Sequence, residues 1–302
     1  MRHEPANNES LSVGQALHKG PSPLKILLRA AFLALACLAA FAPSTPCGAE
    51  PLRIISFNTL WKGQHDPNYV AVARMLKGSG AHIVALQEVR YAETVTNLCK
   101  ELGWKWFCAS APVVSEGCVQ FAFLWDRSRC SLIQDSHNPT LWPEPEVGAF
   151  HRPPFVIGLR ETSNGRSYWL IDVHLYFGNT SKAAVAERKA ELRSLERTYT
   201  IFEKRVPKVY VAILGDFNLP LGEIQAENLT FKAYQSSKTT LAREGKRYSQ
   251  SYDHFAFNDR FREDLHPAFR SLNVISRFFR NDFDLYRKTV SDHIPICMEL
   301  PK

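Results

Sequence analysis

Polar residues that could bind a metal ion or transfer a proton stand at the ends of six strand-like segments. They are Asn58, Glu88, His174, Asp216, Asp253 and the pair Asp292-His293, which adjoin the runs RIISF, IVALQ, WLIDVHL, VAILG, DHFAF and IPICMEL. One polar residue at one strand end is ordinary. Here six strand ends carry such residues, and the strands themselves contain almost no charge. This pattern indicates a functional site.

The residue types define the chemistry of such a site. Carboxylates and a carboxamide, without cysteine, suit a hard cation such as Mg²⁺ or Mn²⁺. Two histidines with carboxylates of their own suit proton transfer near neutral pH. Hydrolysis of a phosphodiester can use both, because a cation offsets charge on the phosphate and a base activates water. The sequence has no Gly-x-Ser-x-Gly elbow and no Walker-type phosphate loop.

The stretch VAILGDFNLP, residues 211–220, illustrates one of these strand ends. Its apolar run predicts a buried strand that stops where glycine and proline appear. Side chains alternate along an extended chain, so Asp216 and Asn218 share one side and Phe217 faces the other. A polar turn is the simplest interpretation of this stretch alone. The other strand ends favour a site in which Asp216 and Asn218 hold water and phosphate, while Phe217 anchors the turn to the core.

Strand and helix signals alternate from Leu52 onward, without an internal repeat or a Gly/Ser/Pro linker. Short runs such as RIISFN and HIVALQ are apolar and β-branched, which predicts interior strands. Between them, a helix is expected to begin near Asp66–Pro67 and to stop at Gly78 or Gly80. Hairpins are expected at residues 126–129 and 161–165.

The clearest helix covers residues 181–205. Ser181 can cap it, and the residues Val185, Leu192, Leu195, Tyr199 and Phe202 form an apolar stripe. Lys189, Arg193 and Arg197 line one flank of this stripe, and Arg188 falls within its arc. We expect the flank to be a solvated face, with a track for phosphate groups as the alternative.

Residues 1–49 are predicted to be an N-terminal extension with a secretory signal segment. Lys25 and Arg29 precede the apolar run 30–42, which is shorter than the roughly 20 residues that span a bilayer. The following CGAE is spaced like a cleavage site. An uncleaved membrane anchor is the alternative. Cleavage would leave one domain, residues 50–302, as a secreted or periplasmic monomer without stable membrane insertion.

Cysteine content and charge add two expectations. Five cysteines follow the signal segment, so at least one is unpaired in a monomer, and we expect Cys108 and Cys118 to pair in an oxidising compartment. There is no Cys-x-x-Cys pattern, so a structural zinc site is not expected. The net charge is +7, of which +5 remains without residues 1–49; this moderate excess favours a polyanionic partner without requiring one.

Six motifs in chain order, ISFNTLW, LQEVR, DVHLYFG, LGDFN, YDHFAF and SDHIPI, resemble those of the endonuclease/exonuclease/phosphatase superfamily. Within it the chain is most similar to the deoxyribonuclease I-like endonucleases. The resemblance runs from about Leu52 to Leu300. It implies a four-layer α/β sandwich of two packed, mostly antiparallel sheets flanked by helices, with the active site between the sheet edges.

The resemblance also implies the ligands of a metal ion. Glu88 matches the principal ligand of the family, and Asn58 and Asp292 match its neighbours around the ion. The expected cofactor is Mg²⁺, with Mn²⁺ or Ca²⁺ as alternatives.

Five further residues match the catalytic groups of the family. His293 matches the histidine that activates water or stabilises the attacked phosphate, and Asp253 matches the carboxylate that orients it. Asp216 and Asn218 match the pair that positions the nucleophile and the phosphoryl oxygens. His174 matches a second histidine, near the leaving group.

The sequence departs from the family at the partner of His174. Deoxyribonuclease I has a glutamate on the strand that corresponds to GCVQFAFLW, where this chain has Val119 or a neighbour; the nearest acid is Glu116. Asp172 is an alternative partner, because it lies two residues from His174 on the same strand face. Without a partner, His174 would only hold a phosphate oxygen.

Two arginines bear on the substrate. Arg90 in QEVR matches an arginine that meets the DNA minor groove in the deoxyribonuclease I-like branch, and Arg152 in RPPF resembles a phosphate-contacting arginine there. These matches favour an endonuclease of DNA. A sphingomyelinase-like phosphodiesterase or a phosphatase is the alternative enzyme, and a nuclease fold that only binds its ligand is the alternative without catalysis. His254 is expected to be a packing residue.

Overall fold

The computed structural model describes residues 50–61, 68–113, 120–133, 149–234, 237–243 and 247–302. The compact unit that these residues form extends from Glu50 to Lys302. Several predictions fall outside the described residues: the signal segment 1–49, the helix start at Asp66–Pro67, Glu116, Cys118 and Val119.

Six strands form the first sheet. Their order across the sheet is β11 (Ala268–Ser271), β12 (Ile296–Leu300), β1 (Leu52–Asn58), β2 (Ile83–Val89), β4 (Gln120–Asp126) and β3 (Trp106–Ser110). Strands β1 and β2 run parallel, and the other neighbours run antiparallel. The parallel pair is joined through helix α2 (Tyr69–Ser79), since parallel neighbours need a crossover.

The second sheet has the same plan. Its order is β5 (Cys130–Leu132), β6 (Phe155–Glu161), β7 (Ser167–His174), β8 (Tyr210–Asp216), β10 (Asp253–Phe257) and β9 (Lys232–Tyr234). Strands β7 and β8 are parallel and are joined through helix α4 (Lys182–Arg205); the other neighbours are antiparallel. Each sheet thus has one parallel pair near its middle.

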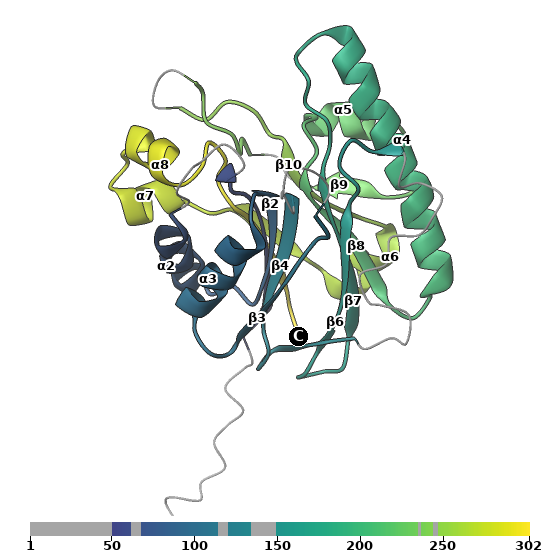
Figure 1. The fold of residues 1–302 in the computed structure, drawn as a ribbon. Helices are drawn as coiled ribbons and strands as arrows, with labels where there is room; N and C mark the ends of the chain where they lie inside the picture. The colour runs from purple at the N-terminus through teal and green to yellow at the C-terminus, as the bar shows by residue number, and fades with distance from the viewer. Residues whose placement is uncertain (1–49, 62–67, 114–119, 134–148, 235–236, 244–246) are drawn as a thin grey trace, which may run out of the picture. The chain divides into compact units, whose positions relative to one another are not determined.

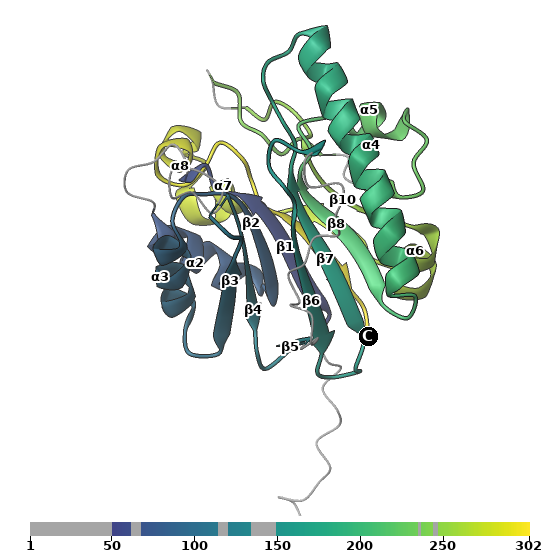
Figure 2. The same ribbon diagram turned by 45° about the vertical axis from the view of Figure 1, so that its right-hand side comes forward.

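The two sheets pack face to face with helices on their outer faces (Figures 1 and 2). Helices α2, α3 (Ala92–Leu102), α7 (Val274–Phe279) and α8 (Phe283–Thr289) share a buried apolar cluster with the first sheet. Helices α4 and α5 (Leu221–Gln225) share one with the second sheet. A third cluster lies between the sheets and includes residues of helix α6 (Asp259–Leu265). The predicted four-layer α/β sandwich is confirmed.

One of the two predicted hairpins is present. Strands β6 and β7 pair antiparallel around residues 161–165, as expected. The turn at residues 126–129 is formed, with Ser128 donating a hydrogen bond to Asp126, but it carries the chain from β4 in one sheet to β5 in the other. Both edges of β4 are already paired with β2 and β3, so β5 cannot pair with it. The prediction of a hairpin there is wrong.

Helix α4 matches its prediction closely. The Ser181 hydroxyl accepts a hydrogen bond from the Ala184 N–H, and the apolar stripe is packed in the outer core. The basic flank is not simply solvated, because Lys189 and Arg193 form ion pairs with Glu227 near helix α5. These two side chains therefore hold α4 to α5, and the structure does not present them as a phosphate track.

Two further observations concern export. In the part of the chain that the structure describes, no helix combines the length and the apolar character needed to cross a bilayer. Cys99, Cys108, Cys130 and Cys297 are free thiols. The predicted partner of Cys108 lies outside the described residues, so that disulfide stays a prediction.

Candidate active site

The polar strand ends meet at one edge of the sandwich, opposite the chain end marked C in Figure 1. In the second sheet, Asp216 of β8 is the register partner of His174 on β7 and of Asp253 on β10. In the first sheet, Asn58 and Glu88 stand at the adjoining ends of the parallel strands β1 and β2. The carboxyl ends of two parallel pairs, one from each sheet, therefore face each other.

Asp216 is the centre of this group. Its Oδ2 atom accepts a hydrogen bond of 3.0 Å from Asn58 Nδ2, and the same amide donates to Glu88 Oε1 at 3.1 Å. Nε2 of His174 lies 3.6 Å from Oδ2, and Nε2 of His293 lies 3.7 Å from it. Two histidines and one amide thus converge on a single carboxylate oxygen that is almost fully buried.

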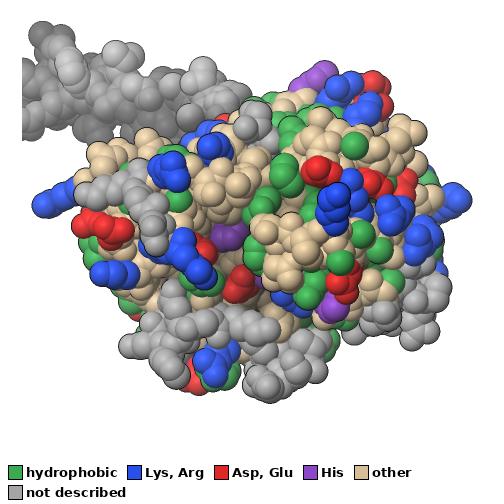
Figure 3. Space-filling model, turned by 90° about the horizontal axis from the view of Figure 1, so that it is seen from above, with side chains coloured by type: hydrophobic (Ala, Val, Ile, Leu, Met, Phe, Trp, Pro, Cys, Tyr) green, Lys and Arg blue, Asp and Glu red, His purple; other side chains and the backbone are tan. Residues whose placement is uncertain are grey.

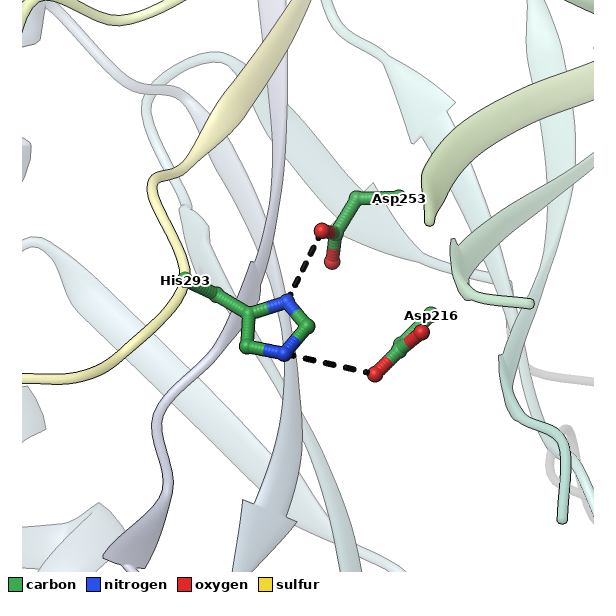
Figure 4. A group of neighbouring side chains, drawn as sticks. All are labelled: Asp216, Asp253 and His293. Atoms are coloured by element: carbon green, nitrogen blue, oxygen red, sulfur yellow. Dashed lines mark hydrogen bonds and ion pairs between the residues drawn. The ribbon is translucent and has the colours of Figure 1, made fainter. Parts of the chain in front are cut away.

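His293 has a second carboxylate of its own (Figure 4). Its Nδ1 atom lies 2.8 Å from Asp253 Oδ2, and both side chains are buried. Burial alone would lower the pKa of His293, but the charges of Asp253 and Asp216 and the hydrogen bond that the ring donates to Asp253 raise that pKa well above its ordinary value. Asp253 therefore orients the ring and stabilises its protonated form.

Crowding of carboxylates also affects Asp216. Burial raises the pKa of Asp216 to about 7, and the charge of Asp253 adds to this effect, although the charge of His293 opposes it. Asp216, Asp253 and His293 offer ligand atoms that all lie within 4.8 Å of one another. These three residues could therefore hold a metal ion.

A β-bulge at Glu88 turns its side chain toward the site. Glu88 has a left-handed backbone with φ of 56°, and the pairing of β2 with β4 shifts register between Gln87 and Val89. Such a bulge turns a side chain out of the regular alternation, and bulges are common next to active sites. Asn218, with φ of 51°, is a second left-handed residue at the site, and its side chain donates to the Leu175 carbonyl.

Gly215 allows strands β7 and β8 to approach each other closely. Its φ is 141°, and a Cβ atom at this position would lie 2.0 Å from the carbonyl oxygen of Val173. Only glycine tolerates this combination. The close approach brings Leu175 N–H to the carbonyl of Asp216 at 3.0 Å and keeps His174 beside Asp216.

No family model and no curated protein sequence matches this chain. Solved structures do. D. rerio TDP2 complexed with a single-strand DNA product has a TM-score of 0.56 and 16% identity, over 84% of this chain and 100% of that one. An endonuclease/exonuclease/phosphatase family protein of Bacteroides thetaiotaomicron has a TM-score of 0.58 and 13% identity, over 83% and 98%. A mannosyl-6-phosphatase from B. thetaiotaomicron gives 0.58 and 13%, over 82% and 99%.

The chain has the endonuclease/exonuclease/phosphatase fold. Its expected site residues lie at one end of that fold, where Asn58, Glu88, His174 and Asp216 are in direct contact. Seen from above, a histidine and acidic side chains lie in a hollow near the middle of the face, with lysine and arginine side chains on both sides (Figure 3).

Asp292 lies beside the group of site residues, and its role as a metal ligand stays a prediction. It follows Ser291 beside the site, but its Oδ2 atom lies 3.4 Å from Arg287, and it makes no hydrogen bond with Glu88 or Asn58. Its Oδ1 atom is buried, and none of the described residues donates a hydrogen bond to it. That oxygen remains available to a cation.

Arg152 lies at the site, and part of its guanidinium forms hydrogen bonds with the backbone. Its Nε and Nη2 atoms donate to the carbonyls of His174 and Leu175 at 2.8 and 2.6 Å. Burial lowers the pKa of Arg152, while the charges of Asp216 and Glu88 act in the opposite direction. Arg90 lies over the ring of Tyr91 at 5.0 Å. Their contacts with substrate stay predictions.

Asp172 is not the partner of His174. Its Oδ1 atom accepts a hydrogen bond of 2.6 Å from Gln87 on the facing sheet, and Asp172 makes no hydrogen bond or ion pair with His174. Gln87 also donates to Ser56. Burial raises the pKa of Asp172 well above its ordinary value, although the bond from Gln87 opposes this. The pair joins the two sheets directly below the site.

Two residues were missed by the sequence interpretation. The Ser291 hydroxyl donates to the Asn58 carbonyl at 2.7 Å and accepts from the His293 N–H at 3.0 Å. The Tyr286 hydroxyl donates to the His293 carbonyl at 2.7 Å. Ser291 is the first residue of the SDHIPI motif, so its place was visible in the sequence, but nothing there indicated the role of Tyr286. His254 is buried against Phe217, as expected of a packing residue.

Proposed function

We propose that this protein is a divalent-metal-dependent phosphodiester hydrolase and that it cleaves DNA as an endonuclease. The observation that carries the proposal is the convergence on Asp216 of one amide and two histidines, with Glu88 on the same amide and Asp253 behind His293. Proton transfer and phosphate binding need these groups within a few ångströms of one reacting centre.

The donor set fits a hard cation. Glu88 and Asn58 would hold Mg²⁺, Mn²⁺ or Ca²⁺ together with the Oδ1 atom of Asp292, since all three side chains offer oxygen atoms. When bound, the cation supplies charge that offsets the developing charge on the phosphate.

The residues of this chain supply the rest of the chemistry. Asp253 holds Nδ1 of His293, so the Nε2 atom faces Asp216 and exchanges a proton there. Asp216 and Asn218 hold the attacking water in line, with Asp216 fixed by the backbone N–H of Asn218 at 2.9 Å. His174, on the other side of Oδ2, binds a phosphoryl oxygen or protonates the leaving group. Arg152 holds the backbone that carries His174 and adds positive charge.

Three observations support DNA as the substrate. Residues 50–302 hold 33 basic and 28 acidic residues, and their net charge of +5 suits a polyanion. Arg90 and Arg152 match arginines of the DNA-cleaving branch, and a structure with this fold holds a single-strand DNA product. We further propose that the chain acts after export, as a secreted or periplasmic monomer, once residues 1–49 have been removed.

A phosphatase is the second candidate, because a mannosyl-6-phosphatase has the same fold. The test is a side-by-side assay of the purified protein on supercoiled plasmid, sphingomyelin and sugar phosphates, with Mg²⁺, Mn²⁺, Ca²⁺ or EDTA. We expect nicked plasmid with Mg²⁺ or Mn²⁺, and none with EDTA. If the plasmid stays intact while a sugar phosphate or lipid is hydrolysed, the protein is a phosphatase or a lipid phosphodiesterase and the endonuclease proposal is wrong. A protein that binds DNA but hydrolyses nothing would be a binding module.

A further inference from the structure

Two aromatic rings stand half-exposed beside the catalytic end of β8. The ring of Phe177 is 42% exposed, and Tyr252 is half-buried next to it. Their centroids are 6.5 Å apart, with the ring planes inclined by 54°. Large apolar side chains are usually buried unless a binding surface needs them, so this exposed pair calls for an explanation.

The backbone ties both rings to the active site. The Tyr252 carbonyl accepts a hydrogen bond of 2.8 Å from the N–H of Phe217, and Asp253 follows Tyr252 directly. On the other side, Leu175, two residues before Phe177, accepts a hydrogen bond from Asn218. The backbone segments that carry the two rings therefore both hydrogen-bond to the segment 216–218.

A buried arginine fixes the exposed ring. Arg188 of helix α4 is only 3% exposed, and its guanidinium carbon lies 5.4 Å from the centroid of Phe177. Its Nη1 and Nη2 atoms donate to the carbonyls of Phe177 and Asn179. Among the described residues, no carboxylate forms an ion pair with Arg188. A buried cation without a counter-charge is unfavourable, so its presence indicates that a fixed ring and a positive charge are needed here.

The surroundings define what could lie on this surface. The residues after Phe177, which are Gly178, Asn179 and Thr180, are exposed and polar, so there is no continuous apolar area of the kind that inserts into a lipid surface. A ring without directional hydrogen-bond donors suits a flat π-face, and every nucleobase has one. Arg188 is buried and its Nη atoms donate to backbone carbonyls, so it supports the ring from behind.

We propose that Phe177 and Tyr252, backed by Arg188, form a stacking platform for one unpaired nucleobase next to the scissile phosphate of single-stranded DNA. A base inside a duplex is covered by its neighbours, so only an unpaired or extruded base can reach the rings. The platform thus directs the enzyme toward single strands without selecting a base. This inference rests on the proposed function, whose substrate it narrows.

A binding experiment tests the platform without catalysis. The full chain is titrated, in EDTA, into a single-stranded oligonucleotide that carries 2-aminopurine, whose fluorescence falls when it stacks on an aromatic ring. We expect quenching with the wild-type protein and with Phe177→Trp, and its loss with Phe177→Ala. Trp104→Ala is the matched control, because Trp104 is 81% exposed but lies away from the site in the turn before β3. Equal quenching by Phe177→Ala and Trp104→Ala would overturn the platform.

A cleavage experiment separates the platform from the proposed function. With Mg²⁺ or Mn²⁺, kcat/KM is compared for an oligonucleotide and for one with an abasic residue beside the cleaved phosphate. We expect the wild-type protein to prefer the complete strand by about 5- to 100-fold, the usual effect of stacking one base, and Phe177→Ala to lose that preference. A preference that Phe177→Ala leaves unchanged would contradict the platform. Quenching without cleavage would support the platform and refute the nuclease.

Discussion

Nδ1 of His293 lies 2.8 Å from Oδ2 of Asp253, and the two side chains are buried together between the sheets. The carboxylate fixes the orientation of the imidazole, so that Nε2 is the nitrogen that faces Asp216. The backbone of His293 is held separately by Ser291 and Tyr286. Among the described residues, Asp253 is the one that hydrogen-bonds to Nδ1 of His293, so a substitution of Asp253 tests how the ring is oriented.

Replacement of Asp253 by Asn should remove the charge and keep the shape. An amide can still accept a hydrogen bond from Nδ1, but it does not stabilise the protonated ring, so the pKa of His293 should fall. We expect kcat for DNA cleavage to fall by about 10²- to 10⁴-fold, the usual contribution of a general acid or base, with little change in KM. Steady-state kinetics on a fluorogenic oligonucleotide measure both constants. Asp259→Asn, an exposed position on helix α6, is the control and should retain wild-type kinetics.

Glu88→Gln tests the metal site. The variant keeps the size of the side chain but loses a charge that a cation would need, so half-saturation of activity should require at least about tenfold more Mg²⁺. Binding can also be measured without turnover: saturating Mg²⁺ should raise the unfolding temperature of the wild-type protein, since a ligand of the native state stabilises it, and should raise that of Glu88→Gln less. Identical responses in both proteins would remove Glu88 from the metal site. Glu187→Gln, on the exposed face of α4, is the control.

Gly215→Ala should be strongly destabilising. The added methyl group would lie 2.0 Å from the Val173 carbonyl, and the φ of 141° is unfavourable for any residue with a Cβ atom. We expect a loss of about 4 kcal/mol in the free energy of unfolding, or failure to fold. Gly222→Ala makes a matched control in helix α5, because a Cβ atom there meets nothing within 4 Å. It should gain about 0.5–1 kcal/mol, since alanine is the better helix former. Urea unfolding followed by circular dichroism compares the two.

His82 should make stability depend on pH. Its Nδ1 atom accepts from the Arg53 N–H, and its Nε2 atom lies 2.9 Å from Arg129. Burial, followed by the charge of Arg129, lowers the pKa of His82 to about 4. Between pH 6.5 and 4 the unfolded chain therefore binds a proton that the folded chain does not, and stability falls as the pH falls.

The size of this effect can be measured by difference. At 1.36 kcal/mol for each pH unit, His82 should account for a loss of up to about 3 kcal/mol between pH 6.5 and 4. Carboxylates also contribute at acid pH, so the slope of the unfolding free energy against pH is compared for the wild-type protein and for His82→Gln. The slope of His82→Gln should be flatter in this range. His266→Asn, at an exposed histidine, should follow the wild-type curve. Parallel curves for wild type and His82→Gln would contradict the assignment.

Local signals in the sequence predicted most elements, and the polar strand ends predicted a group of residues that the structure brings together. Helix α4 follows from its Ser181 cap and its apolar stripe, and the β6–β7 hairpin follows from the turn at residues 161–165. Asp216 and Asn218 were expected on one side of the chain and Phe217 in the core, where they lie. Side-chain period, caps and turn residues act within a few positions, so they can be interpreted without knowing the partner strands.

Only the tertiary structure decided which groups meet. The turn after β4 leads to the other sheet because both edges of β4 are occupied, and Asp172 bonds Gln87 because the two side chains face each other across the sheets. Arg152 donates two hydrogen bonds to the backbone carbonyls of His174 and Leu175. Both His174 and His293 lie close to the Oδ2 atom of Asp216. Which strand edges are free, and which side chains face each other between the sheets, depends on how the whole sandwich is assembled. A single segment of the sequence therefore cannot reveal them.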